Sequence, residues 1–235
     1  MAKLTLNPTL NQTYRILIDE EVKGKAVDFT AELKRSRKAE ADGRWEEACD
    51  IRYGAMQALV ELLPEDDLVE LDWDDRLTRD AVVVAYCSAV DFFLVGDWEM
   101  AAAGLELVLD VDGDDHLEAT TLLAFVYVAM GEWDSFEDIL PDVADKSPEK
   151  SLLILWAEWV QSGKINKGEY ATFARYHLPF LREWCAEEHP TDGAYLADID
   201  SDHPTKAAKA RELWLQTEHL WREHGGFIDA LKAAK

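Results

Sequence analysis

Apolar residues recur at helical spacing along most of the chain, and glycine residues separate the apolar-periodic segments at near-regular intervals. Gly43, Gly96, Gly131 and Gly163 each follow one such segment and precede another. The last three are separated by 35 and 32 residues. A glycine in this position is typical of the left-handed cap that ends a helix. The pattern therefore predicts an all-helical protein made of successive helical hairpins.

A tryptophan stands two residues after each of the first three glycines, at Trp45, Trp98 and Trp133. Acidic residues follow each tryptophan, as expected at the positively polarised start of a helix. Three such turns, with helical periodicity on both sides, exceed what chance produces. We therefore expect these tryptophans to be packing residues between helices.

The turns resemble those of the tetratricopeptide repeat family, whose unit is two antiparallel helices over about 34 residues. In that family a small residue stands three positions after the aromatic one, and another stands seven positions further on. Ala48 and Ala55 match both positions in the first hairpin, and Ala101 matches the first of them in the second. Val108 and, in the third hairpin, Phe136 depart from the pattern, which implies local repacking.

The resemblance covers roughly residues 26–175, which we interpret as the repeat array. The fourth turn matches weakly, because Ile165 replaces the aromatic residue while Gly168 keeps the small one. The resemblance implies a short right-handed α-solenoid of tetratricopeptide-like hairpins.

Residues 1–25 precede the array as an N-terminal extension. Leu10, Tyr14, Leu17 and Ile18 recur there at helical spacing. We therefore expect the extension to form an additional helix.

Two further segments are expected to depart from the repeat. Residues 65–77 lengthen the connection between the first two hairpins and are expected to protrude as a loop with Trp73 at its centre. Residues 176–235 are expected to hold C-terminal helices. After an Asp- and Gly-rich loop at 190–204, a last helix over 204–224 would cap the array.

The net charge of −24 is concentrated in the middle third of the chain. Residues 65–145 hold 2 basic and 23 acidic side chains, whereas the segments before and after are nearly balanced. Such a field repels nucleic-acid phosphates and anionic membranes and attracts basic surfaces. We expect no nucleic-acid or membrane partner. Two interpretations remain open, a solvated face that keeps the protein soluble and a surface for a basic partner.

No pattern in the sequence predicts a catalytic or metal site. The run 110–115 resembles the start of a calcium loop, but its glycine comes too early and Thr121 stands where the loop needs a closing glutamate. The histidines lack zinc-ligand spacing, and nucleophile-elbow and phosphate-loop motifs are absent. We expect no cofactor, no metal and no enzymatic activity. A site assembled from distant carboxylates is the remaining alternative.

The cysteines and the N-terminus favour a cytoplasmic location. Cys49, Cys87 and Cys185 are odd in number and lie far apart, which suits reduced thiols better than a disulfide framework. The N-terminal residues show no basic start followed by an apolar run of signal-peptide length.

In the tetratricopeptide family the first helices of the hairpins line a concave groove that holds a peptide or a partner helix. Carried over by position, the resemblance implies a mostly apolar groove inside the acidic segment, which suits an amphipathic basic helix or a hydrophobic peptide with basic flanks. The family's clamp for a C-terminal carboxylate needs several basic residues, and only one stands at such a place here. A C-terminal helix or a second subunit that fills the groove is the alternative. The expected groove residues are Arg37, Val83, Tyr86, Val90, Phe93, Glu118, Thr121, Phe125 and Val128.

The leading hypothesis for function is a protein-interaction scaffold, an adaptor or chaperone that binds a peptide, a helix or a basic protein surface. The alternative is an inhibitor or immunity-type protein whose acidic middle third blocks a basic partner. A hydrolase is a third possibility, for which the sequence nominates no residues. Neither the partner nor the oligomeric state follows from the sequence.

Overall fold

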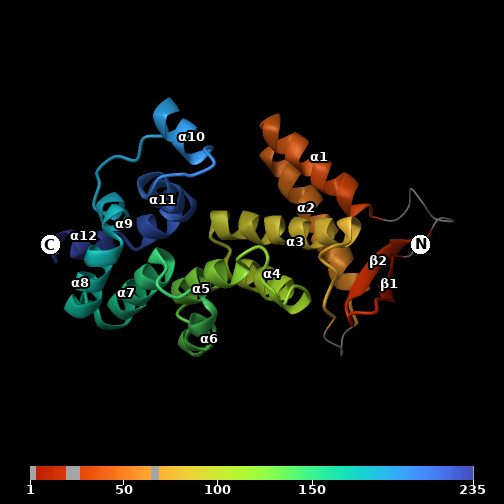
Figure 1. The fold of residues 1–235 in the computed structure, drawn as a ribbon, viewed down its shortest axis with the longest axis horizontal. Helices are drawn as coiled ribbons and strands as arrows, with labels where there is room; N and C mark the ends of the chain where they lie inside the picture. The colour runs from red at the N-terminus through yellow and green to blue at the C-terminus, as the bar shows by residue number, and fades with distance from the viewer. Residues whose placement is uncertain (1–3, 20–26, 65–68, 235) are drawn as a thin grey trace. The chain divides into compact units, whose positions relative to one another are not determined.

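A computed structural model describes residues 4–19, 27–64 and 69–234 of the chain. Helices dominate these residues, and the strands form one two-stranded sheet (Figure 1). The expected helical fold class is therefore correct in its coarse form. The chain divides into two compact units, Met1–Val126 and Tyr127–Lys235. The division lies inside the range 26–175 that the sequence assigns to one array.

The first unit is built from two helical hairpins and the beginning of a fifth helix. α1 packs against α2, α2 against α3 and α3 against α4, and α1 and α3, the first helices of the two hairpins, also pack together. Their apolar faces form one core in which Phe29, Leu59 and Leu105 are fully buried. The helices are α1 (Phe29–Ala41), α2 (Trp45–Leu62), α3 (Arg76–Val95), α4 (Trp98–Val111) and α5 (Ala119–Met130).

The four glycines predicted to be left-handed helix caps adopt that conformation. Their φ angles are +75° at Gly43, +79° at Gly96, +75° at Gly131 and +68° at Gly163. At the first three, the amide of the following residue donates to a carbonyl five residues earlier, as Asp97 N does to Phe92 O at 3.0 Å. These bonds satisfy carbonyls that the helix end leaves without partners.

The small residues expected between the helices are buried, whereas of the turn tryptophans Trp98 and Trp133 are half-buried and Trp45 is exposed. Ala48 and Ala101 are both buried, as expected of small residues at these positions of α2 and α4. Trp98 packs edge-on against Phe93, with 5.8 Å between ring centroids. Trp45 is 61% exposed, so its expected packing role is wrong. Five residues before Trp45 the chain carries Glu40 in place of an aromatic residue, and Glu40 pairs with a cation instead.

The helix expected in the N-terminal extension is also wrong, because the residues form a β-hairpin. Strands β1 (Leu4–Pro8) and β2 (Tyr14–Ile18) pair antiparallel. Exposure alternates along β2, where Ile16 is buried between the exposed side chains of Arg15 and Leu17. This period of two is that of a half-buried strand. Residues 20–26 lie outside the described residues.

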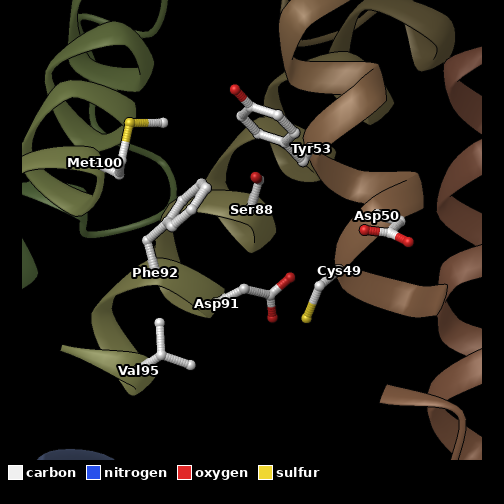
Figure 2. Close-up of a pocket in the computed structure, with 8 residues that line it drawn as sticks. All are labelled: Cys49, Asp50, Tyr53, Ser88, Asp91, Phe92, Val95 and Met100. Atoms are coloured by element: carbon white, nitrogen blue, oxygen red, sulfur yellow. The ribbon is translucent and has the colours of Figure 1, made fainter. Parts of the chain in front are cut away.

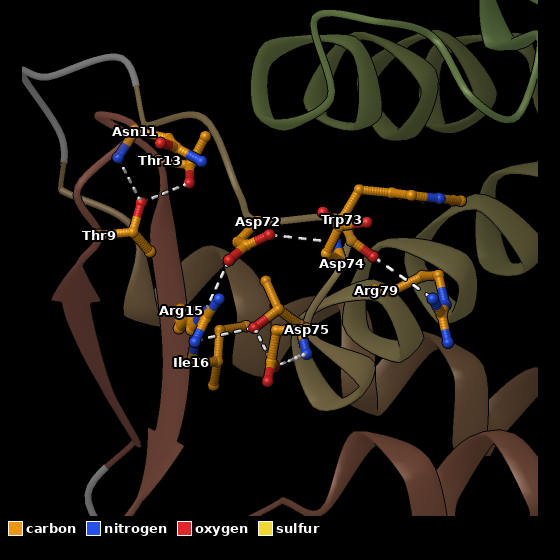
Figure 3. Close-up of polar contacts among 11 residues, drawn as sticks. Thr9, Asn11, Thr13, Arg15, Ile16, Asp72, Trp73, Asp74, Asp75 and Arg79 are labelled. Carbon is orange, nitrogen blue, oxygen red and sulfur yellow. Dashed lines mark hydrogen bonds and ion pairs between the residues drawn. The ribbon is translucent and has the colours of Figure 1, made fainter.

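Residues 69–75, which precede α3, pack against the rest of the first unit. The expected protruding loop is therefore wrong for the part of it that the structure describes. Val69 and Leu71 are buried, and Leu71 N donates to Val111 O at 2.8 Å. Trp73 stacks on the ring of His116, with 4.4 Å between centroids. Figure 3 shows how polar contacts join this segment to β2, among them Arg15 Nε to Asp72 Oδ2 at 2.6 Å. Residues 65–68 of the expected loop are not among the described residues.

The second unit holds the end of α5 and the remaining helices. Its core contains a cluster of tryptophans, in which Trp156 and Trp221 meet edge-on with 5.1 Å between centroids. α9 and α11 pack together, and α12 packs against α11 and α7. The helices are α6 (Trp133–Ile139), η2 (Leu140–Asp142), α7 (Pro148–Ser162), α8 (Lys167–Tyr176), α9 (Leu178–Trp184), α10 (Gly193–Ile199), α11 (Lys206–Glu223) and α12 (Gly225–Ala233).

Two expectations for this unit need correction. The predicted last helix over 204–224 is present as α11, but α12 follows it directly from Gly225. The expected loop at 190–204 contains the short helix α10, which Asp192 caps by accepting from Tyr195 N at 2.9 Å.

Candidate functional site

The groove residues expected from the sequence divide into buried and accessible positions. Phe93, Phe125 and Val128 are each 1% exposed and belong to the core, so their expected role in a groove is wrong. Val83, Tyr86, Val90 and Thr121 are half-buried, whereas Arg37 and Glu118 are exposed. Glu118 precedes α5 with a φ of +54° and is therefore not on a helix face. Helical spacing places these side chains along one face of each helix, but part of that face packs in the core and is not open to a ligand.

Within the described residues, the first unit has a hollow between the second helices of its two hairpins, α2 and α4. Two adjoining cavities of about 440 and 500 Å³ share Tyr53 and Met100 as lining residues. Together they form a groove between α2 and α4, which we call the α2–α4 groove; α3 lines one end of it. Its lining residues are Cys49, Asp50, Tyr53, Met56, Gln57, Val60, Glu61, Ser88, Asp91, Phe92, Val95, Met100, Ala103, Gly104 and Leu107.

Apolar side chains line most of this groove and remain open to solvent. Tyr53 meets Phe92 edge-on, with 5.6 Å between centroids and an angle of 84°. Val60 is 52% exposed and Val95 is 77% exposed. Large apolar side chains grouped at one open surface are a sign of a binding site, because each gains free energy when it is covered.

Figure 2 shows the end of the groove that contains Cys49, Asp50, Ser88 and Asp91, which we call its polar end. A buried ion pair between Arg52 and Asp91 lies beside it. Asp91 reaches from α3 toward Cys49 of α2. Arg52 donates through Nη1 to Asp91 Oδ1 at 2.8 Å and through Nη2 to Glu40 Oε2 at 2.5 Å. One guanidinium therefore serves two carboxylates, and Asp50 lines the same end of the groove.

The second oxygen of Asp91 has no nitrogen or oxygen donor within the described residues, although the atom is buried. The Cys49 thiol hydrogen-bonds with this carboxylate. Burial, together with the neighbouring Asp91 charge, raises the pKa of Cys49 above its ordinary value. Burial also raises the pKa of Asp91, although the nearby Arg52 charge works in the opposite direction. The thiol is therefore a poor nucleophile, and the carboxylate lacks full compensation.

The helices on both sides of the groove carry acidic residues. α4 holds Glu99, Glu106 and Asp110 and has no basic residue. The only basic residue of α2 is Arg52, which is engaged in the buried pair; its acidic residues are Glu46, Glu47, Asp50 and Glu61. The groove is thus an apolar surface in an acidic surround, and a basic, partly apolar ligand complements it.

The described residues offer little for metal or nucleophilic chemistry. They contain no group of three or more His, Cys, Asp or Glu side chains placed to hold a metal ion. Asp112 and His116, in the run that resembles a calcium loop, are joined instead by a bond of 2.6 Å between Oδ1 and Nδ1. Within the same ranges, no helix has both the length and the apolar character needed to cross a membrane.

Sequence reasoning missed the α2–α4 groove because it placed the binding surface on the first helices of the hairpins. A signal was present in α2, where Tyr53, Met56 and Val60 recur at helical spacing beside the alanine stripe of the core. When a helix has apolar residues on two faces, one face packs in the core of its own unit, and the other is left for contact with a partner.

No family model matches this chain, and no curated protein or solved structure is significantly similar to it.

Proposed function

We propose that this chain is a protein-interaction scaffold of tetratricopeptide-like hairpins that binds an amphipathic basic helix in the α2–α4 groove. The observation that carries the proposal is the combination of exposed apolar lining residues with flanking helices on which the accessible charges are acidic. The proposal is of binding without catalysis, by a cytoplasmic adaptor or chaperone.

The groove suits a helix better than an extended peptide. α2 and α4, its two walls, are helices whose backbone groups are bonded within the helix, so they offer no strand edge to an extended peptide. A helical ligand satisfies its own backbone and needs only side-chain contacts. From Asp50 to Glu61 the groove runs for about 17 Å along α2, which matches a helix of about three turns.

Charge and apolar contact would have different roles in this complex. The acidic flanks would draw a basic ligand toward the groove and set its rate of association. Burial of Tyr53, Val60 and Val95 would set its rate of dissociation, since aromatic and aliphatic anchors dominate binding energy. Higher salt is therefore expected to slow association more than it speeds dissociation.

Site-directed photo-cross-linking tests the proposal. A photoreactive amino acid at the groove position Gln57 is expected to capture a partner from the native source, and the same group at the exposed Tyr176 of the second unit is the control. The captured peptide should be an amphipathic basic helix, and Val60→Glu should abolish the cross-link. Equal capture from both positions, or capture unaffected by Val60→Glu, would contradict the proposal.

The same experiment distinguishes the proposed scaffold from the alternative of an inhibitor whose acidic surface blocks a basic partner. A partner held by the acidic surface alone would cross-link from positions outside the groove and would be insensitive to Val60→Glu. Charge reversal at Glu99 and Glu106 would then release it.

A further inference from the structure

We propose that the polar end of the α2–α4 groove is an arginine pocket, in which one arginine of the bound helix donates to Asp91 and Asp50. The inference rests on the proposed function and specifies the ligand that the groove selects. The pocket is formed by Cys49, Asp50, Tyr53, Ser88, Asp91 and Phe92, and its cavity measures about 440 Å³.

The first step is a carboxylate that the protein compensates incompletely. Asp91 Oδ1 accepts from Arg52 and the Cys49 thiol, a weak donor, hydrogen-bonds with the same carboxylate, but Asp91 Oδ2 has no nitrogen or oxygen donor among the described residues. A buried acceptor without a donor costs free energy, and a charged one costs more. Asp91 lines the cavity, so a ligand N–H group that reaches its carboxylate would lower that cost.

The second step is the balance of charge around the cavity. Its ionisable lining consists of two carboxylates, one thiol and one phenol, and no basic side chain lines it. The nearest guanidinium, that of Arg52, is already divided between Asp91 and Glu40. The pocket is therefore short of positive charge, and it selects a cation over a neutral donor.

The third step distinguishes arginine from lysine. Tyr53 and Phe92, whose rings meet edge-on, line the same cavity as the two carboxylates. A guanidinium is planar and weakly hydrated, so it stacks on such rings while its several N–H groups reach more than one carboxylate. An ammonium group would lose more hydration on entering the same partly apolar cavity.

The pocket also fixes how the ligand lies. Asp50 and Val60 are separated along α2 by about 15 Å, the rise of ten helical residues. The arginine would therefore stand at one end of the bound helix, and its apolar residues would continue toward Val60 and Leu107.

Peptide selection tests the inference on the full chain. A display library of random helical peptides is selected for binding to the wild-type chain and against binding to Val60→Glu, so that only groove-binding peptides are kept. We expect an arginine at one recurrent position of these peptides. In a synthetic peptide, replacing this arginine with citrulline, which keeps its shape and loses its charge, should weaken binding about tenfold or more. Replacement with lysine should cause a smaller loss.

A double-mutant cycle then places the arginine in the pocket. Asp91→Asn keeps an oxygen for Arg52 and removes the charge, and in this variant the loss from citrulline should fall to about twofold. If Asp91→Asn does not fold, the variant of the exposed Asp50, Asp50→Asn, replaces it. The loss of affinity caused by citrulline should again be smaller than in the wild-type chain. Asp229→Asn, on α12 of the second unit, is the control and should leave the citrulline effect unchanged.

The outcomes separate the two proposals. Groove-binding peptides without a recurrent arginine, or a citrulline effect that is the same in wild-type and variant chains, would overturn the arginine pocket and leave the groove as a binding site. If the selection recovers no peptide that binds the wild-type chain and fails to bind Val60→Glu, both the arginine pocket and the groove as a binding site are overturned.

Discussion

Gly104 of α4 lies so close to Ala89 of α3 that a Cβ at position 104 would stand 2.8 Å from the Ala89 Cβ. The Sδ of Met56 in α2 would be 3.6 Å from the same atom. Three helices therefore meet at this glycine, and Met56 and Gly104 both line the α2–α4 groove. The missing side chain lets α4 approach α3 closely at the base of the groove.

Replacing Gly104 with alanine should destabilise the protein, although alanine is the better helix former. The added methyl group overpacks the contact with Ala89, at an expected cost of about 1–3 kcal/mol. Gly54→Ala in α2 is the matched control, because a Cβ there meets nothing within 4 Å. It should stabilise the chain by up to about 1 kcal/mol. Denaturant unfolding of both variants measures the difference, and a stabilising effect at both positions would contradict the close approach.

Removing Arg52 should be more costly than removing an ordinary surface charge. Its side chain is 8% exposed, and its loss would leave Asp91 buried without its counter-charge. We expect Arg52→Ala to lower the free energy of unfolding by about 3–5 kcal/mol. The double variant Arg52→Leu/Asp91→Leu should recover much of this loss, since it removes the uncompensated charge as well. Equal instability of the single and double variants would refute this account of the pair.

The second unit should lose stability in mild acid. Burial lowers the pKa of His224 below 6.5 and also that of His177, where Lys206 adds to the effect. Below pH 6.5 the unfolded chain therefore binds protons that the folded chain does not, and the free energy of unfolding falls until the pH passes the lowered pKa values. His224→Phe keeps an aromatic ring beside Trp156 and should flatten the dependence between pH 7.5 and 5.5. Denaturant unfolding followed by tryptophan fluorescence measures this pH dependence of the free energy of unfolding. If the variant shows the same pH dependence as the wild-type chain, His224 does not contribute to it.

Two aromatic residues of the first unit should respond to alanine substitution in opposite ways. Phe93 is a core residue, so Phe93→Ala should cost about 3–5 kcal/mol of stability. Tyr53 lines the open groove, so Tyr53→Ala should mainly speed dissociation of a bound peptide, by about tenfold or more. Thermal melts and binding kinetics on both variants separate stability from binding. A large stability loss from Tyr53→Ala with no kinetic effect would assign it to the core.

Local physical requirements made part of this fold predictable from the sequence. The glycine caps follow from a backbone conformation that other residues adopt at a cost, and the buried alanines follow from the volume available where two helices meet. The β-hairpin was missed because Leu10, Tyr14, Leu17 and Ile18 fit helical spacing, whereas Ile16 N donates to Thr78 Oγ1, 62 residues away in sequence. Such long-range contacts leave no mark on local periodicity.

The candidate site was less predictable than the fold, for a related reason. Helical spacing identifies apolar stripes, but it does not say which stripe the core covers. Phe93 and Tyr53 are both aromatic residues on amphipathic helices, and only the tertiary structure buries the first and leaves the second open. The acidic character of the middle third was evident from the sequence, and the structure adds the apolar groove beside acidic α4.

The most direct test of the proposed groove is methyl NMR of the methionines in the presence of a selected helical peptide. The chain has four methionines, of which Met56 and Met100 line the α2–α4 groove and Met130, at the end of α5, does not. A basic amphipathic peptide recovered from the library should shift the methyl signals of Met56 and Met100 saturably. It should leave the Met130 signal in place, and a version with glutamate at its basic positions should cause no shift. Saturable binding that leaves Met56 and Met100 unchanged, or that shifts Met130 alone, would contradict the groove as the binding site.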